Sequence, residues 1–247
     1  MNLLRSCHLV LCIVGTIAVC SAQDNADPRL TEVWEPVPPG VIPGRGQSPP
    51  SDAFVLFDGT QLAEWRSVRG GAARWTVRDS CLTVFPGAGD IETLRVFGDV
   101  QLHLEFRCPA GGHGRGQGRG QSGVLLQGLY EVQVLDSYGN PTYANGQCGA
   151  IYKQSIPLVN ACRPPGEWQS FDIVFLAPRF TDGGSILSPA FITVFQNGVL
   201  VQNHAEIQGG TVDRGGPKYE LHPLKMPLRL QEHGSPVGYR NIWVREL

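Results

Sequence analysis

From Phe54 onward, apolar and polar residues alternate in short runs that are separated by turns rich in glycine, proline and asparagine. In residues 101–106, two leucines and a phenylalanine fall on one face of an extended strand and polar residues fall on the other. Asn197-Gly198, between two such runs, favours a type I′ hairpin turn. No window shows sustained helical periodicity. The pattern predicts an all-β fold, a jelly-roll β-sandwich of two antiparallel sheets.

Residues 53–247 are predicted to form one domain, and two different segments precede it. Residues 1–22 are typical of a signal peptide, with Arg5 before a short apolar run and small residues at its end. Residues 23–52 hold seven of the nineteen prolines, which indicates an extended arm or linker. We therefore expect an exported protein, periplasmic or extracellular. Lipid attachment at Cys20 is a less favoured alternative, and no stable membrane insertion is expected after cleavage.

The charge of the chain gives no general attraction to nucleic acid, because its formal net charge is -2. One segment is unusual: residues 111–123 contain seven glycines interleaved with arginine and glutamine. An RNA-binding arginine-glycine tract fits poorly with export and with the net charge. The remaining interpretations are a flexible connecting loop, or a mobile loop that carries arginine over a ligand site.

Four cysteines remain after the signal peptide, Cys81, Cys108, Cys148 and Cys162. In an exported chain an even number is compatible with disulfides, and we predict the pairs Cys148–Cys162 and Cys81–Cys108. A zinc site is the alternative use, but no Cys-x-x-Cys spacing accompanies these residues.

A run with candidate chemistry covers residues 130–136, Tyr-Glu-Val-Gln-Val-Leu-Asp. On a regular strand Glu131 and Gln133 share a face, and a bulge near Leu135 would return Asp136 to it. Carbohydrate-active sandwiches use such rows, in which one carboxylate acts as acid or base and its neighbour tunes the pKa. The alternative is an ordinary strand with its polar face in solvent.

A second run follows near the carboxyl end, with Gln231, His233, Arg240 and Asn241 within eleven residues. Histidine exchanges protons near neutral pH, and arginine and asparagine offer fixed donors to ligand oxygens. A solvated loop histidine is the competing interpretation.

Two further cationic residues are candidates for substrate binding. Lys153 follows a strand-like run and is able to supply positive charge to an oxyanion, and Arg119 lies in the glycine-rich segment. Both are also compatible with ordinary surface positions. No Gly-x-Ser-x-Gly, Walker or His-Glu-x-x-His motif is present, so serine-hydrolase, nucleotide and zinc-peptidase functions lose support.

Several runs taken together resemble the 3-keto-disaccharide hydrolase domain family. They follow one another in the expected order: residues 55–59, 119–124, 130–137, 149–152, 165–169, 230–234 and 240–245. The resemblance implies a concanavalin-like jelly-roll sandwich that acts on 3-keto-glycosides, with a carbohydrate as its partner.

The chemistry implied by the resemblance assigns a role to most candidates. A ketone at C3 acidifies the proton at C2, so Glu131 is the expected base with Asp136 as its orienter. His233 is the expected acid or base at the leaving oxygen. Arg240, Lys153 or a divalent cation would stabilise the enolate, and no cofactor is certain.

Two other functions remain open at this point. A retaining glycosidase of the laminarinase-like kind uses paired carboxylates on a similar strand, although Gln133 stands where that mechanism favours an acid. A non-catalytic carbohydrate-binding module is also compatible, because a fold does not determine a function.

Overall fold

The computed structural model describes residues 27–46 and 48–247, so the predicted signal peptide over residues 1–22 lies outside the described part. The chain divides into two compact units, and the second, Val41–Leu247, contains the sandwich. In the first unit, the described residues form a short 3-10 turn, η1 (Pro28–Thr31). The Asp27 side chain caps this turn by accepting a hydrogen bond of 3.1 Å from the backbone N–H of Arg29.

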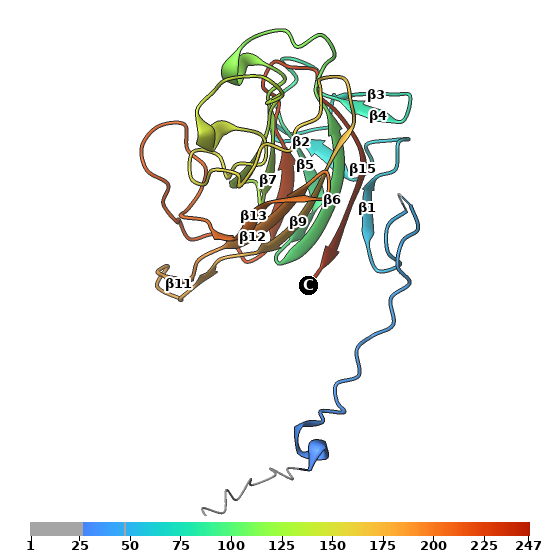
Figure 1. Ribbon diagram of the computed structural model, residues 1–247, viewed down its shortest axis with the longest axis vertical. Helices are drawn as coiled ribbons and strands as arrows, with labels where there is room; N and C mark the ends of the chain where they lie inside the picture. Colours follow the sequence, from blue (N-terminus) through green and yellow to red (C-terminus); the bar gives the residue numbers. More distant parts are fainter. Residues whose placement is uncertain (1–26, 47) are drawn as a thin grey trace, which may run out of the picture. The chain divides into compact units, whose positions relative to one another are not determined.

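The larger sheet of the second unit has eight antiparallel strands (Figure 1). Its order is β13 (Val199–Glu206), β12 (Phe191–Gln196), β9 (Gln169–Leu176), β6 (Val100–Arg107), β15 (Gly238–Glu246), β4 (Cys81–Thr83) and β3 (Thr76–Arg78), with β1 (Phe54–Phe57) paired to β15. The long central pairs β9–β6 and β6–β15 give this sheet a continuous outer surface.

The smaller sheet has five antiparallel strands. Its order is β2 (Trp65–Ser67), β5 (Ile91–Phe97), β14 (Met226–Leu230), β7 (Ser122–Leu126) and β8 (Tyr130–Val134). A separate two-stranded ribbon joins β10 (Arg179–Phe180) and β11 (Ile186–Ser188).

Alternation along the strands places the core between the two sheets. Leu102, Leu104 and Phe106 of β6 are fully buried, as the period of two predicts. From the smaller sheet, β8 contributes its alternate residues, Tyr130, Val132 and Val134. The prediction of an all-β sandwich is confirmed. The hairpin between β12 and β13 also turns at Asn197-Gly198, where both residues have positive φ, 54° and 78°.

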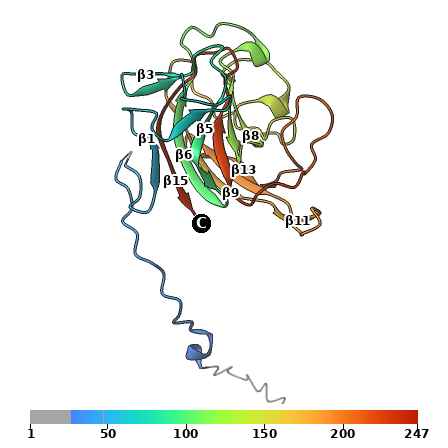
Figure 2. The ribbon, with the colours of Figure 1, turned by 180° about the vertical axis from the view of Figure 1, so that it is seen from behind.

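Among the described residues of the second unit, helical structure is limited to two short 3-10 turns, η2 (Gly116–Gly118) and η3 (Ala144–Gly146). The loops that carry them gather at one end of the sandwich, as seen from both sides (Figure 1, Figure 2). Within the described residues, no helix is both long and apolar enough to cross a bilayer.

The predicted disulfides are not formed, since all four cysteines of the described residues are free. The Cys148 and Cys162 thiols are neighbours, and each accepts a hydrogen bond from the Gln196 amide, at 3.5 and 3.2 Å. Cys81 and Cys108 are separated for a topological reason: β15 lies between β4 and β6. Two strand spacings amount to about 9–10 Å, which exceeds the reach of a disulfide of about 7 Å between Cα atoms.

Candidate active site

Glu131 and Gln133 project from the outer face of the smaller sheet, because their neighbours Tyr130, Val132 and Val134 turn into the core. Gly123 of β7 lies in register with Gln133 and beside Glu131. A β-carbon at Gly123 would stand 2.7 Å from Glu131 Oε1, so the glycine provides the room in which the carboxyl lies. The predicted face-sharing of Glu131 and Gln133 is confirmed.

Gln231 reaches the same face from the end of β14. Its backbone N–H donates to the Gly123 carbonyl at 3.0 Å, and alternation after the buried Leu230 turns its side chain outward. The structure thus brings Gln231 beside the two β8 side chains, across β7. We call Glu131, Gln133 and Gln231 the Glu131 cluster.

The Glu131 cluster is rich in buried polar atoms without a protein partner. Glu131 Oε1, Gln133 Oε1 and Gln231 Oε1 are all buried and accept no hydrogen bond from any described residue. Each such atom costs about 1–3 kcal/mol relative to a satisfied one, and native proteins keep few of them. Three such atoms on one face of the smaller sheet, on β8 and at the end of β14 with β7 between them, indicate a surface that is completed by a ligand.

Burial also changes the acidity of the Glu131 carboxyl. Only 3% of this residue is exposed, and desolvation, followed by the negative charge of Asp90, raises its pKa to about 7. Asp90 is held in place by the backbone N–H of Glu232, which donates to its carboxylate at 2.8 Å. A carboxyl with a pKa near neutrality is matched to proton abstraction at physiological pH.

A rim of polar residues borders the Glu131 cluster. The backbone N–H of Tyr152 donates to the Glu131 carbonyl at 3.1 Å, and the next residue, Lys153, forms an ion pair of 2.7 Å with Asp213. The hydrogen bond and charge of Lys153 lower the pKa of the Asp213 carboxyl, and His233 acts in the same direction. Lys153 is therefore paired with Asp213 on the side of the sandwich that carries Glu131, and His233 is exposed in the loop that follows β14.

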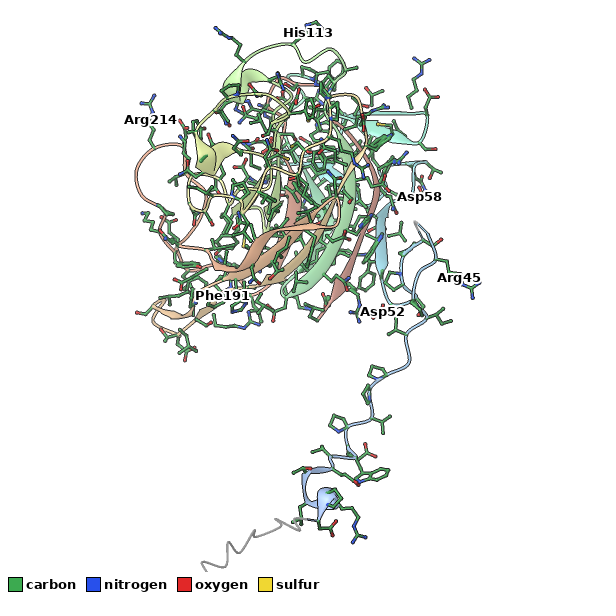
Figure 3. The ribbon with its side chains drawn as sticks, viewed as in Figure 1. Arg45, Asp52, Asp58, His113, Phe191 and Arg214 are labelled. Atoms are coloured by element: carbon green, nitrogen blue, oxygen red, sulfur yellow. The ribbon has the colours of Figure 1, made fainter. Side chains whose placement is uncertain are left out.

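The glycine-rich loop reaches over β8, but the side chain it presents there is an amide. Gln133 Nε2 donates to Gln117 Oε1 at 2.7 Å, and Gln117 donates in turn to the Gly146 carbonyl at 2.9 Å. The Asn140 side chain fixes the loop through both polar groups of the Gly116 backbone, at 2.8 and 2.9 Å. His113 lies at the outer tip of the loop (Figure 3).

Comparison with known proteins agrees with this architecture. Residues 52–245 match the 3-keto-alpha-glucoside-1,2-lyase-like domain family. The chain belongs to this family.

Two solved structures are similar to this chain. A proposed glycosyl hydrolase from Parabacteroides distasonis is 51% identical, with a TM-score of 0.86 over 89% of this chain and 96% of that one. A second proposed glycosyl hydrolase from the same organism, at 21% identity and a TM-score of 0.57, covers 79% of this chain and 94% of its own, and shows the fold alone. No curated protein matches the chain significantly. The family is one of carbohydrate-active domains.

In this family member, Asp136 and Arg119 form a pair of their own. Arg119 Nε lies 2.8 Å from Asp136 Oδ2, and both side chains are largely buried. The strand alternation does break after Val134, since Leu135 also enters the core. No hydrogen bond or ion pair in the described residues joins Asp136 to Glu131. The catalytic role of Asp136 and the substrate-binding role of Arg119 stay predictions. Their ion pair holds the glycine-rich loop, which carries Arg119, to the end of the β8 segment.

The structure separates Arg240 and Asn241 from the Glu131 cluster. Both lie on β15 of the larger sheet, where Arg240 pairs with Glu105 at 2.6 Å and Asn241 donates to Glu105 at 3.1 Å. The expectation that Arg240 stabilises an enolate formed beside Glu131 is therefore wrong. Alternation along one strand reveals which residues share a face, but not which of two sheets that face belongs to.

Two residues of the site lack a strong sequence signal. Asp90 lies in a turn before β5 and Gln117 in a glycine-rich loop, so neither belongs to an alternating run. Among the described residues no group of three or more His, Cys, Asp or Glu side chains is arranged to hold a metal ion. We therefore assign no ligand set to the divalent cation considered above.

Proposed function

We propose that this protein cleaves the glycosidic bond of sugars already oxidised to a ketone at C3, with Glu131 as the base that removes the C2 proton. The observation that supports this most directly is the Glu131 carboxyl itself, with its pKa raised to about 7 by burial and by Asp90. A C2 proton next to a ketone is acidic enough for such a modest base.

The reaction balances without an added oxidant or reductant. The ionised Glu131 carboxylate takes the proton from C2, and the electron pair of that bond forms an enolate with the C3 ketone. The enolate then expels the substituent at C1, whose oxygen takes a proton from His233. Addition of water across the resulting C1–C2 double bond completes a net hydrolysis.

The neighbours of Glu131 suit the oxygens of such a substrate. The developing enolate needs fixed donors or positive charge, for which the Gln231 amide and the Lys153 ammonium are candidates on this side of the sandwich. Tyr143 and Tyr152, joined through their hydroxyls at 2.8 Å, add aromatic surface next to Lys153. Sugars commonly pack their apolar faces on such rings.

The arrangement is less suited to a retaining glycosidase, which needs two carboxyls about 5–5.5 Å apart. Position 133 is an amide, and Asp136 is paired with Arg119. Glu92, on the same sheet face, is paired with Arg66 at 2.8 Å. Asp90 is the remaining candidate for a second carboxylate. Its negative charge raises the pKa of Glu131, so Glu131 stays in its acid form at mildly acidic pH.

The decisive experiment compares a glycoside with its 3-keto form, by chromatography of the released sugar. We expect cleavage of the keto form alone, and Glu131→Gln should abolish it while the matched variant Glu206→Gln, on β13 of the other sheet, retains it. Cleavage of both forms would favour an ordinary glycosidase, and saturable binding without cleavage would favour a carbohydrate-binding module.

A further inference from the structure

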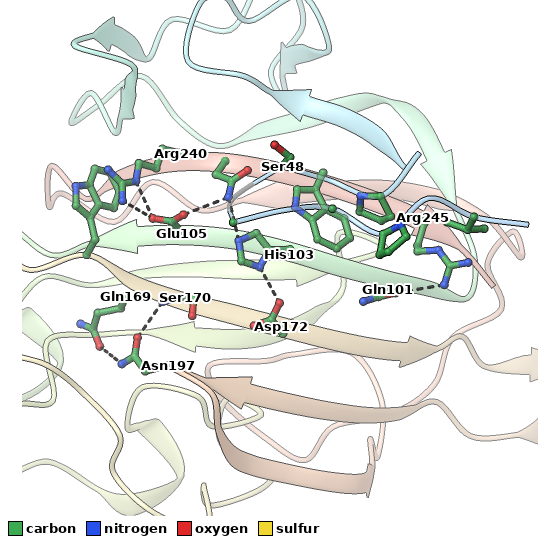
Figure 4. A pocket seen from close by; sticks show the side chains of 18 of the residues that line it. Ser48, Gln101, His103, Glu105, Gln169, Ser170, Asp172, Asn197, Arg240 and Arg245 are labelled. Carbon is green, nitrogen blue, oxygen red and sulfur yellow. Dashed lines mark hydrogen bonds and ion pairs between the residues drawn. The ribbon is translucent and has the colours of Figure 1, made fainter. Parts of the chain in front are cut away.

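We propose that the outer face of the larger sheet carries a second ligand site, separate from the Glu131 cluster, that binds a neutral saccharide. A cleft of about 880 Å³ lies over β9, β6 and β15 (Figure 4). Sites for small molecules typically have volumes of about 300–1,000 Å³. The cleft is lined by residues of the second unit alone, so it belongs to one compact body.

The floor of the cleft is a connected hydrogen-bond chain. Asn241 Nδ2 donates to Glu105 Oε1 at 3.1 Å and approaches His103 Nε2 at 3.2 Å. Since that amide nitrogen only donates, His103 Nε2 accepts, and Nδ1 carries the proton that it donates to Asp172 at 2.7 Å. The His103 ring stacks on Trp243 with 5.3 Å between ring centres. The donors and acceptors of the floor are therefore fixed in direction.

One end of the cleft is a stack of planar groups. The Arg240 guanidinium is held by Glu105 through hydrogen bonds and an ion pair of 2.6–2.7 Å, and it lies 4.1 Å from the centre of the Trp168 ring. An arginine fixed between a carboxylate and an aromatic ring keeps its remaining N–H groups oriented. This is a built wall rather than a pair of solvated surface charges.

The opposite side is formed by residues 41–46 and 48–50, the end of the proline-rich segment. Two hydrogen bonds of 3.0 Å close this loop, from the Ile42 N–H to the Ser51 hydroxyl and from the Ser51 N–H to the Ile42 carbonyl. Next to it, Asp52 pairs with Arg245 of β15 at 2.7 Å. Figure 3 shows Asp52 beside the start of β1. The loop is thus tied to the strand that also supplies the cleft floor.

The charges of the lining residues indicate which ligand fits. The lining carries three arginines, Arg163, Arg240 and Arg245, and two carboxylates, Glu105 and Asp172. Arg245 is paired with Asp52 next to the cleft, so the charges of the two signs balance. A phosphorylated or otherwise anionic ligand would require an excess of positive charge. Free hydrogen-bonding capacity remains, because Asp172 uses one carboxylate oxygen for His103 and no described residue bonds the Ser170 hydroxyl. Fixed donors and acceptors between two tryptophans, without net charge, suit a polyhydroxylated neutral molecule.

The test uses the full chain with Glu131→Gln, which blocks the proposed reaction, and titrates maltose, cellobiose and trehalose by calorimetry. We expect saturable binding of at least one disaccharide, with the same Kd in Glu131→Gln and in the wild type. Ser170→Phe fills the cleft without removing a side chain of the hydrogen-bonded floor, and should weaken that binding at least about tenfold. Asp172→Asn should weaken it as well, whereas the matched variant Asp182→Asn, on an exposed loop, should leave it unchanged.

Cleavage of 3-keto-glycoside provides the second measurement, because the two sites lie on different sheets. Ser170→Phe should retain the wild-type cleavage rate, and its circular dichroism and melting curve should match those of the wild type. The proposal is overturned if none of the three disaccharides binds saturably. It is equally overturned if binding survives Ser170→Phe in a folded protein, or if Glu131→Gln alone removes it, since the ligand would then occupy the Glu131 cluster.

Discussion

Replacing Glu131 by glutamine should remove activity and, above neutral pH, make the protein more stable. The carboxyl is buried with a pKa raised to about 7 from an ordinary value of 4.5. The folded protein therefore holds this proton more tightly than the unfolded chain does. The free energy of unfolding must fall as the pH rises from about 4.5 to about 7, and it stays at the lower value above that range.

The magnitude follows from the size of the shift. A difference of about 2.5 pKa units corresponds to about 3 kcal/mol at 1.36 kcal/mol per unit. Glutamine has the shape of the protonated acid and does not ionise, so Glu131→Gln lacks this penalty. The variant and the wild type should have similar stability below pH 4.5 and differ by about 3 kcal/mol at pH 8. For a domain of this size that is about 6–12 °C in Tm.

Urea denaturation at several values between pH 4.5 and 8 measures the difference, with Glu206→Gln as the control whose curve should parallel the wild type. In the wild type, kcat/KM should rise with pH through an inflection near 7, because the base must be ionised. Glu131→Gln should lower kcat roughly 10²–10⁴-fold. A stability difference that does not change with pH would refute the raised pKa. A stabilised variant with full activity would refute the catalytic role alone.

Three further predictions address the surroundings of the site. Gly123→Ala should reduce cleavage strongly, since its β-carbon would stand 2.7 Å from Glu131 Oε1, and the loss should appear in kcat measured on a protein whose circular dichroism is unchanged. Asp136→Ala should lower the free energy of unfolding by about 3–5 kcal/mol in urea, because it leaves the buried Arg119 unpaired. Finally, alkylation of the denatured protein without reductant should label all four cysteines of the described residues; unlabelled pairs recovered as linked peptides would contradict the free thiols of the structure.

The fold and half of the site could be predicted because both depend on a period of two. Alternation in β6 and β8 determines which residues enter the core, and it places Glu131 and Gln133 together without any tertiary information. Asp136 lies just beyond the strand, where alternation no longer applies, and its partner Arg119 comes from a loop. The Arg240 side chain faces outward, as a period of two allows. It lies on the larger sheet, however, whereas Glu131 lies on the smaller one.

The energetic cost of the Glu131 cluster supports a functional role for it. A sandwich that had only to be stable would gain from an apolar residue at position 131, since the carboxyl gives up about 3 kcal/mol at neutral pH. Unpartnered amide oxygens on Gln133 and Gln231, on either side of β7, add to that cost. Three of the nine unpartnered buried side-chain atoms of the described residues lie in this cluster, together with the carboxyl whose pKa is raised, as is typical of a surface that a ligand completes. The His103–Asn241–Glu105 chain on the other sheet differs in this respect, because its polar groups satisfy one another.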